Sequence, residues 1–179
     1  MIPVFVLLFL LPFAWGRPAA AIIFSLAGIT DWLDGYIARR MGTTSKFGAF
    51  LDPVADKLLV ATALVLLAHD SSGQIGWMVT LAAAIIIGRE ISISALREWM
   101  AELGARHHVA VSRIGKYKTT AQITALILMI FQTPLLGLDI YLIGFGFLIV
   151  AALLTLWSMY VYLRQAWPFL SEEMLKPEE

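Results

Sequence analysis

Residues 31–56 read DWLDGYIARRMGTTSKFGAFLDPVAD, and this stretch joins two long apolar segments of the chain. It contains four carboxylates within 26 positions: Asp31, Asp34, Asp52 and Asp56. Residues three and four apart are neighbours on a helix, so each pair of aspartates shares one helix face. The connection between the two segments, residues 41–51, is short. We therefore expect two antiparallel neighbouring helices whose acidic faces meet.

The composition indicates a protein that faces lipid. Hydrophobic residues make up 60% of the 179 residues and charged residues only 15%, whereas a soluble domain carries about 25% charged residues. The mean hydropathy is +0.81. The net charge is zero, and we expect no nucleic-acid partner. With no cysteine, disulfides and thiolate chemistry are excluded, and any metal must be bound by oxygen or imidazole.

The apolar segments predict an all-α integral membrane protein with six transmembrane helices, since a span needs about 20 mostly apolar residues. The predicted spans are Ile2–Trp15, Pro18–Arg40, Pro53–His69, Ile75–Leu103, Ile114–Thr133 and Ile140–Arg164. The first is short for a bilayer crossing. We expect residues 1–170 to form a single transmembrane domain and residues 171–179 to be an acidic, solvated tail.

Basic residues of short loops predict the orientation, because they gather on the cytoplasmic side. One side of the predicted bundle receives most of them: Arg39, Arg40, Lys46, Lys57, Arg97, Arg106, Arg113, Lys116, Lys118 and Arg164. The opposite loops hold only Arg17, with Asp70 and Asp139. The sequence therefore predicts that the basic side and both termini are cytoplasmic.

The depth of the first aspartate pair favours a functional site. A rise of about 1.5 Å per residue from Pro18 places Asp31 roughly 20 Å from the outer boundary, within a hydrocarbon core about 30 Å thick. An ionised carboxylate at that depth is costly unless it is compensated. Four converging carboxylates make a hard, all-oxygen site suited to Mg²⁺, Mn²⁺ or Ca²⁺.

Simpler interpretations exist for single residues of this stretch. Asp52 before Pro53 is a good helix start, with Asp52 as N-cap. Asp56 could pair with Lys57 or Arg39. Small residues beside the carboxylates let a ligand approach the backbone, but they also let membrane helices pack closely; these residues are Gly35 and Ala38 in the helix and Gly48 in the expected loop.

A group of cations is expected at the same level. Arg89 interrupts an apolar segment, and counting from Ile75 places it roughly 20 Å down, level with Asp31. Arg97, Lys116 and Lys118 lie near the same end. Arginine and lysine there suit a phosphate-bearing substrate. Alternatively, the last three snorkel to lipid headgroups, and Arg89 pairs with Glu90 or an aspartate.

The spacing of these residues resembles a family signature. Residues 31–56 match D-x2-D-G-x2-A-R-x8-G-x3-D-x3-D at all eight defined positions, which is the pattern of the CDP-alcohol phosphotransferases. Further stretches resemble the bacterial members that use glycerol 3-phosphate as acceptor. These are residues 47–57, 89–91, 95–104 and 115–119.

The resemblance implies a role for each matching residue. Asp31, Asp34, Asp52 and Asp56 would hold two divalent cations, Mg²⁺ or Mn²⁺, on the diphosphate of CDP-diacylglycerol. Asp31, Gly35, Ala38, Arg39 and Gly48 would bind that nucleotide lipid. Asp56 would also be the general base on the 1-hydroxyl of glycerol 3-phosphate. Arg89, Arg97, Lys116 and Lys118 would bind the phosphate of the acceptor.

It also implies the reaction and the setting. The phosphatidyl group of CDP-diacylglycerol would be transferred to glycerol 3-phosphate, with release of CMP, in phospholipid biosynthesis. The expected protein is a homodimer of six-helix chains in the bacterial inner membrane, with a polar cavity that faces the cytoplasm. Family members usually begin with an interfacial helix before the Ile-Pro pair, whereas here Ile2-Pro3 comes at once.

Two alternatives remain open from the sequence. A sibling enzyme with serine or inositol phosphate as acceptor would share the aspartate pattern. A cation transporter would also carry buried acids, but it predicts sites near the midplane and interrupted helices in two repeats.

Overall fold

The computed structural model describes the backbone of residues 1–41, 46–102, 113–135 and 137–174. Side chains are described for the same residues except 31–32, 34–41, 46–53, 102, 113–116 and 169–174. Six helices follow one another: α1 Ile2–Leu10, α2 Gly16–Met41, α3 Lys46–Asp70, α4 Gly73–Glu102, α5 Arg113–Phe131 and α6 Ile140–Met174. The described ranges contain no strand beyond an isolated bridge between Leu135 and Leu138. The prediction of an all-α protein is confirmed.

The first helix is shorter than the sequence predicted. α1 has a proline in its first turn, where the missing N–H costs nothing. It ends at Leu10, and the extended backbone of Leu11 turns the chain away. The prediction that this helix reaches Trp15 is wrong, because Phe13 and Trp15 instead stack their rings in the turn before α2.

The third helix begins earlier than predicted. Its first residue is Lys46, so Asp52 and Pro53 lie inside the helix and Gly48 lies in its first turn. The interpretation of Asp52 as an N-cap is therefore wrong, and Gly48 is not in a loop. α6 is longer than predicted, because it passes Arg164, includes Pro168 and ends at Met174.

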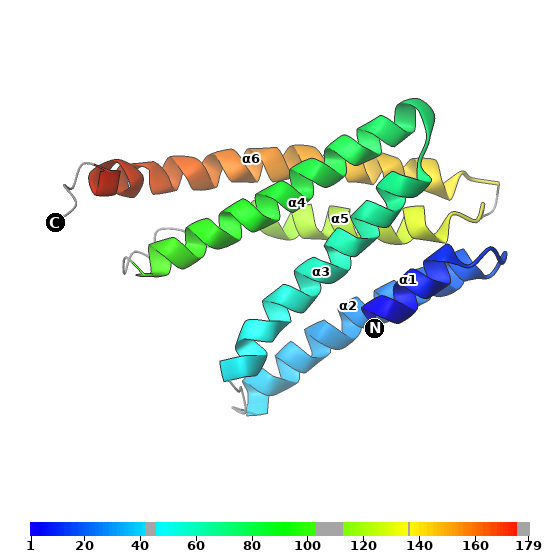
Figure 1. Ribbon diagram of the computed structural model, residues 1–179, viewed down its shortest axis with the longest axis horizontal. Helices are drawn as coiled ribbons and strands as arrows, with labels where there is room; N and C mark the ends of the chain where they lie inside the picture. The colour runs from blue at the N-terminus through cyan, green and yellow to red at the C-terminus, as the bar shows by residue number, and fades with distance from the viewer. Residues whose placement is uncertain (42–45, 103–112, 136, 175–179) are drawn as a thin grey trace.

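Helix α6 lies along both α4 and α5, and α2 contacts α1, α3 and α5. Figure 1 shows that α2 and α4 end at one end of the molecule, where α3 and α5 begin. We call this the signature end, because it carries residues 31–56. The connections α1–α2, α3–α4 and α5–α6 lie at the opposite end (Figure 1).

The hydrophobic core fills the part of the bundle away from the signature end. Its fully buried side chains come from all six helices and include Phe5, Phe24, Leu64, Ile86 and Leu126. A second, smaller cluster joins α4 and α6 through Ile93, Met100 and Tyr162. This packing positions α3, α4 and α5 around the cavity described below.

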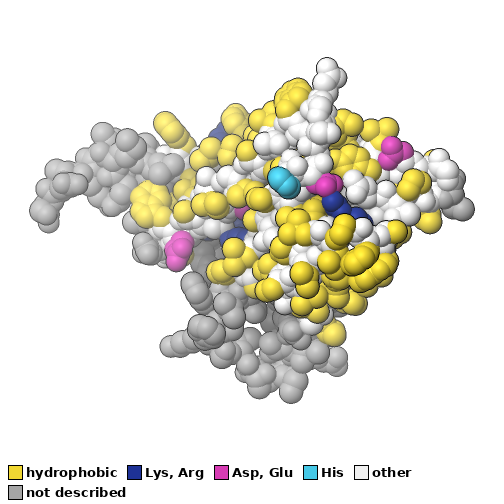
Figure 2. Space-filling view, turned by 45° about the vertical axis from the view of Figure 1, so that its right-hand side comes forward, with side chains coloured by type: hydrophobic (Ala, Val, Ile, Leu, Met, Phe, Trp, Pro, Cys, Tyr) yellow, Lys and Arg dark blue, Asp and Glu magenta, His cyan; other side chains and the backbone are white. Residues whose placement is uncertain are grey.

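The outer surface is apolar. Large hydrophobic side chains are exposed along the helices, such as Leu7, Ile22, Val65, Leu153 and Trp157, and Figure 2 shows them over much of the described surface with few charged groups between. Among the described residues, Gly73–Ala101 and Ile140–Pro168 are long and apolar enough to cross a membrane. An all-helical chain with such a surface is consistent with a membrane protein.

Candidate active site

The four aspartates of the signature lie at matching heights on α2 and α3. Asp31 is ten residues before the end of α2 at Met41, and Asp56 is ten residues after the start of α3 at Lys46. At a rise of about 1.5 Å per residue, each is roughly 15 Å from the connection. Asp34 and Asp52 are seven and six residues from it. Because α2 and α3 are in contact and converge here (Figure 1), the backbone brings the two acidic pairs to one level.

Most of the predicted nucleotide and metal residues lie outside the described side chains. These are Asp31, Asp34, Gly35, Ala38, Arg39, Gly48 and Asp52, and Lys116 of the predicted phosphate site also lies outside them. Asp56 is described and exposed. It borders two cavities: one between α3, α4 and α5, and one lined by Met1, Ala27, Gly28 and Thr30 from the start of the chain and α2. Asp56 therefore lines both cavities.

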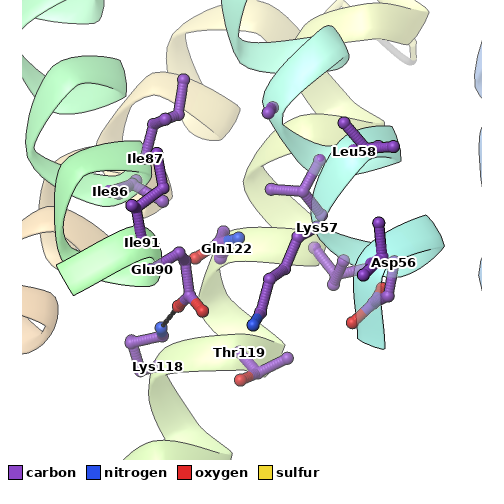
Figure 3. Close-up of a pocket in the computed structure, with 14 residues that line it drawn as sticks. Asp56, Lys57, Leu58, Ile86, Ile87, Glu90, Ile91, Lys118, Thr119 and Gln122 are labelled. Carbon is purple, nitrogen blue, oxygen red and sulfur yellow. Dashed lines mark hydrogen bonds and ion pairs between the residues drawn. The ribbon is translucent and has the colours of Figure 1, made fainter. Parts of the chain in front are cut away.

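The first cavity has a volume of about 280 Å³. Isoleucine, leucine and valine side chains line much of it, while its polar members are Asp56, Lys57, Glu90, Lys118, Thr119 and Gln122. In Figure 3, Asp56 lies on one side and Glu90 with Lys118 on the other. We call this space the α3–α5 cavity.

Glu90 joins two cations of the predicted phosphate site. Lys118 Nζ donates to Glu90 Oε1, and Arg89 Nη1 donates to the same oxygen over 3.0 Å. Lys118 and Arg89 are only 4% and 8% exposed. Arg89 Nη2 also donates to Ser158 Oγ of α6 over 2.9 Å. The predicted pairing of Arg89 with Glu90 is confirmed, and snorkelling of Lys118 is wrong because its ammonium is held inside the bundle.

Arg97 is held by α6 rather than released to the membrane surface. Its Nη2 donates to the hydroxyl of Tyr162 over 2.6 Å. The guanidinium carbons of Arg89 and Arg97 lie 5.4 and 5.0 Å from the centroid of the Tyr162 ring, within the range of a cation–π contact. The tyrosine thus holds both arginines on one side of α4.

Positive charge exceeds negative charge among the described groups of this region. Four cations, Arg89, Arg97, Lys118 and Lys57, lie in this region with two carboxylates, Glu90 and Asp56, and Lys57 Nζ donates to Ser94 Oγ. The Nε atoms of Arg89 and Arg97 are buried, with no hydrogen bond to any described group. A site with surplus cations and spare donors suits an anionic, phosphate-bearing ligand.

Several residues of the site carry no sign of their role in the sequence pattern. Ser158 and Tyr162 are four apart on α6, so they share a face. Gln122 and Ser94 line α5 and α4 beside the predicted cations. One sequence feature could have pointed to Gln122: it is a polar residue in an otherwise apolar helix, one turn after the charged Lys118.

The donor chemistry of the signature suits a divalent metal. The described side chains contain no cluster of three or more acidic or imidazole groups, and three of the four predicted ligands are not among them. The matching heights of the two acidic pairs, with all-oxygen donors and no thiolate, fit a hard cation such as Mg²⁺.

Comparison with known proteins gives a consistent result. The sequence profile of the CDP-alcohol phosphatidyltransferases matches residues 1–160. Three similar curated proteins are all named CDP-diacylglycerol–glycerol-3-phosphate 3-phosphatidyltransferase. The Sodalis glossinidius protein is 56% identical, with 93% of this chain and 88% of the relative covered. The Pseudomonas fluorescens protein is 52% identical, covering 97% and 87%, and the Yersinia enterocolitica protein is 54% identical, covering 96% and 91%.

Proposed function

Because this chain belongs to the CDP-alcohol phosphatidyltransferase family, we propose that it transfers the phosphatidyl group from CDP-diacylglycerol to glycerol 3-phosphate. The products are phosphatidylglycerophosphate and CMP, and the step belongs to phospholipid biosynthesis. The observation that carries this proposal is the identity of 52–56% to transferases of that name over nearly the whole chain. The cations Lys57 and Lys118 in the lining of the α3–α5 cavity, with Arg89 beside Lys118, agree with a phosphorylated acceptor.

In the proposed reaction, the C1 oxygen of glycerol 3-phosphate forms a bond to the phosphorus that bears the diacylglycerol. The bond from that phosphorus to the bridging oxygen breaks, and CMP leaves with this oxygen. Asp56 takes the proton of the C1 hydroxyl. Asp56 is exposed at the border of the α3–α5 cavity, and this place supports a role as base on the acceptor hydroxyl.

Asp31, Asp34, Asp52 and Asp56 would hold two divalent cations, Mg²⁺ or Mn²⁺. When bound, such cations neutralise charge on the transferring phosphoryl group and on the departing phosphate. Asp31, Gly35, Ala38, Arg39 and Gly48 would bind the cytidine diphosphate part of the donor. Their positions on α2 and in the first turn of α3 place them at the signature end.

Arg89, Lys118 and Arg97 bind the phosphate of glycerol 3-phosphate, with Lys116 as a further cation. Glu90, Ser158 and Tyr162 orient the first three through the hydrogen bonds described above. Glutamate is thus a positioning residue. It keeps two flexible cationic side chains in one geometry, so less entropy is lost when the phosphate binds.

The proposed setting is the bacterial inner membrane. The chain would cross it with six helices, the signature end and its cavity facing the cytoplasm, and would form a homodimer. The clustering of Arg97, Lys116 and Arg164 toward that end supports this orientation. CDP-diacylglycerol would enter from the lipid bilayer, while glycerol 3-phosphate and CMP exchange with the cytoplasm.

The test is release of CMP from CDP-diacylglycerol by the purified protein with Mg²⁺ or Mn²⁺. Glycerol 3-phosphate, serine and inositol phosphate are compared as acceptors. We predict turnover only with glycerol 3-phosphate. Turnover with serine alone would overturn the acceptor assignment, and no turnover with any acceptor would overturn the proposed function.

A further inference from the structure

Gln122 is a buried polar residue that no part of the proposed mechanism uses. It lies on α5 one turn after Lys118, is 5% exposed, and lines the α3–α5 cavity. Its Oε1 is buried, with no hydrogen-bond partner among the described groups. Figure 3 shows its side chain facing the same space as the Glu90 carboxylate and the Lys57 amine.

An amide oxygen without a partner in such a place is unfavourable for the folded protein alone. Buried polar groups are nearly always hydrogen-bonded, and one left without a partner weakens the fold. A methionine or leucine would fill the same volume among the isoleucines without that cost. A buried amide at a cavity wall therefore points to a hydrogen bond made with a ligand rather than with the protein.

The neighbouring carboxylate is also only partly used. Arg89 and Lys118 both donate to Oε1 of Glu90. Within the described ranges both of these hydrogen bonds are made to Oε1, and in Figure 3 the second carboxylate oxygen is turned toward the cavity. An acceptor oxygen beside cations suits a hydroxyl of a phosphorylated polyol, and since a hydroxyl has one proton to donate, the buried amide oxygen of Gln122 is the acceptor among the described groups that otherwise lacks a hydrogen bond.

We propose that Gln122 is a specificity-determining residue whose buried Oε1 accepts a hydrogen bond from the C2 hydroxyl of the acceptor. This inference rests on the proposed function. Glycerol 3-phosphate carries three polar groups, and the residues that line the cavity offer a partner for each: Lys118 for the phosphate, Asp56 for the C1 hydroxyl and Gln122 for the C2 hydroxyl between them. The cavity, at about 280 Å³, is close to the lower limit of small-ligand sites, about 300 Å³.

The experiment compares glycerol 3-phosphate with 3-hydroxypropyl phosphate, which has the phosphate and the C1 hydroxyl but no C2 hydroxyl. Release of CMP is measured for the wild type, for Gln122→Met and for the control Gln132→Met. Gln132 is exposed near the opposite end, where its Nε2 donates to Asp70 over 3.4 Å. The readout is the ratio of kcat/KM for the two acceptors.

The wild type is expected to prefer glycerol 3-phosphate by about 10- to 100-fold, the worth of one or two good hydrogen bonds. Gln122→Met should lose most of this preference while keeping its kcat/KM for 3-hydroxypropyl phosphate within about twofold. Gln132→Met should keep the full preference. The milder variant Gln122→Asn, whose amide is one methylene shorter, should lose part of it and decides the matter if Gln122→Met does not fold.

An unchanged ratio in the Gln122 variants would overturn the inference, and so would an equal loss for both acceptors, which is the mark of a purely structural role. Both results leave the proposed function standing, because the wild type still turns over glycerol 3-phosphate. A wild type without turnover on glycerol 3-phosphate would overturn the proposed function itself.

Discussion

The ammonium of Lys118 and the carboxylate of Glu90 form an ion pair inside the helix bundle, across the gap from α5 to α4. Arg89 shares the same carboxylate oxygen. Two buried cations on one carboxylate leave an excess of positive charge, and the bound phosphate of an acceptor would balance it. The ion pair thus joins α4 to α5 and also orients the cations of the proposed phosphate site.

Loss of the Glu90 charge should destabilise the protein. Removing one partner of a buried ion pair costs about 3–5 kcal/mol, and because Glu90 is 26% exposed, we expect about 3 kcal/mol for Glu90→Gln. The measurement is the Tm of the purified protein. The double variant Glu90→Gln with Lys118→Met should recover part of this loss, since it removes a stranded cation.

The control is Asp70→Asn, which breaks the more exposed pair of Arg17 and Asp70 at the opposite end. Such a pair contributes less than about 1 kcal/mol, so its Tm should change little. The single variant Lys118→Met completes the comparison. If the Tm change of the double variant equals the sum of the Tm changes of Glu90→Gln and Lys118→Met, the two side chains are not coupled, and this result would contradict the ion pair.

Replacement of Arg89 should affect acceptor binding more than turnover. Arg89→Ala removes a guanidinium that reaches Glu90 and Ser158 at once. We expect KM for glycerol 3-phosphate to rise about 10- to 100-fold, with a smaller change in kcat. Arg89→Lys should not restore the wild-type KM, because one ammonium cannot reach both Glu90 and Ser158. Arg17→Ala is the matched control, and an unchanged KM in Arg89→Ala would count against a phosphate role.

The four aspartates should bind divalent metal independently of activity. Titration of the metal-free protein with Mn²⁺, followed by the electron paramagnetic resonance of the free ion, should show two ions bound per chain. Asp31→Asn should weaken this binding by about tenfold or more, a usual effect of losing one charged ligand. Asp70→Asn should bind Mn²⁺ like the wild type. Wild-type affinity in a variant lacking all four aspartates would refute the metal site.

The proposed orientation can be tested with single cysteines, because the chain has none of its own. Ser72 is exposed in the α3–α4 connection, and Glu98 is exposed near the signature end of α4. In intact spheroplasts, a membrane-impermeant maleimide should label Ser72→Cys and leave Glu98→Cys unlabelled until the membrane is opened. Labelling of Glu98→Cys from outside would reverse the orientation.

Sequence periodicity and apolar length predicted six helical segments in the correct order, because those signals are local. The first and last residues of the helices were less predictable. Pro53 is a common helix start, yet α3 begins at Lys46, since packing of a longer helix overrides the local preference of one proline. α6 likewise continues past Arg164 through Pro168.

The side-chain partners within the site depend on how the helices are rotated and packed, and the sequence carries little sign of this. Lys118 is 28 positions from Glu90, and Arg97 is 65 from Tyr162. Spacing placed all of these cations at one end of the bundle. It could not show that one glutamate joins Arg89 to Lys118, or that Gln122 lines the same cavity, because these contacts exist only once α4, α5 and α6 are packed together.

The most direct test of the account is CMP release by Asp56→Asn compared with Asp70→Asn, with CDP-diacylglycerol, glycerol 3-phosphate and Mg²⁺. Both changes neutralise one carboxylate of α3, the first at the border of the α3–α5 cavity and the second at the opposite end. We predict that Asp56→Asn loses activity by about 10³-fold or more, as expected when a base and metal ligand is removed, whereas Asp70→Asn stays within about twofold of the wild type. Wild-type CMP release by Asp56→Asn would contradict the account.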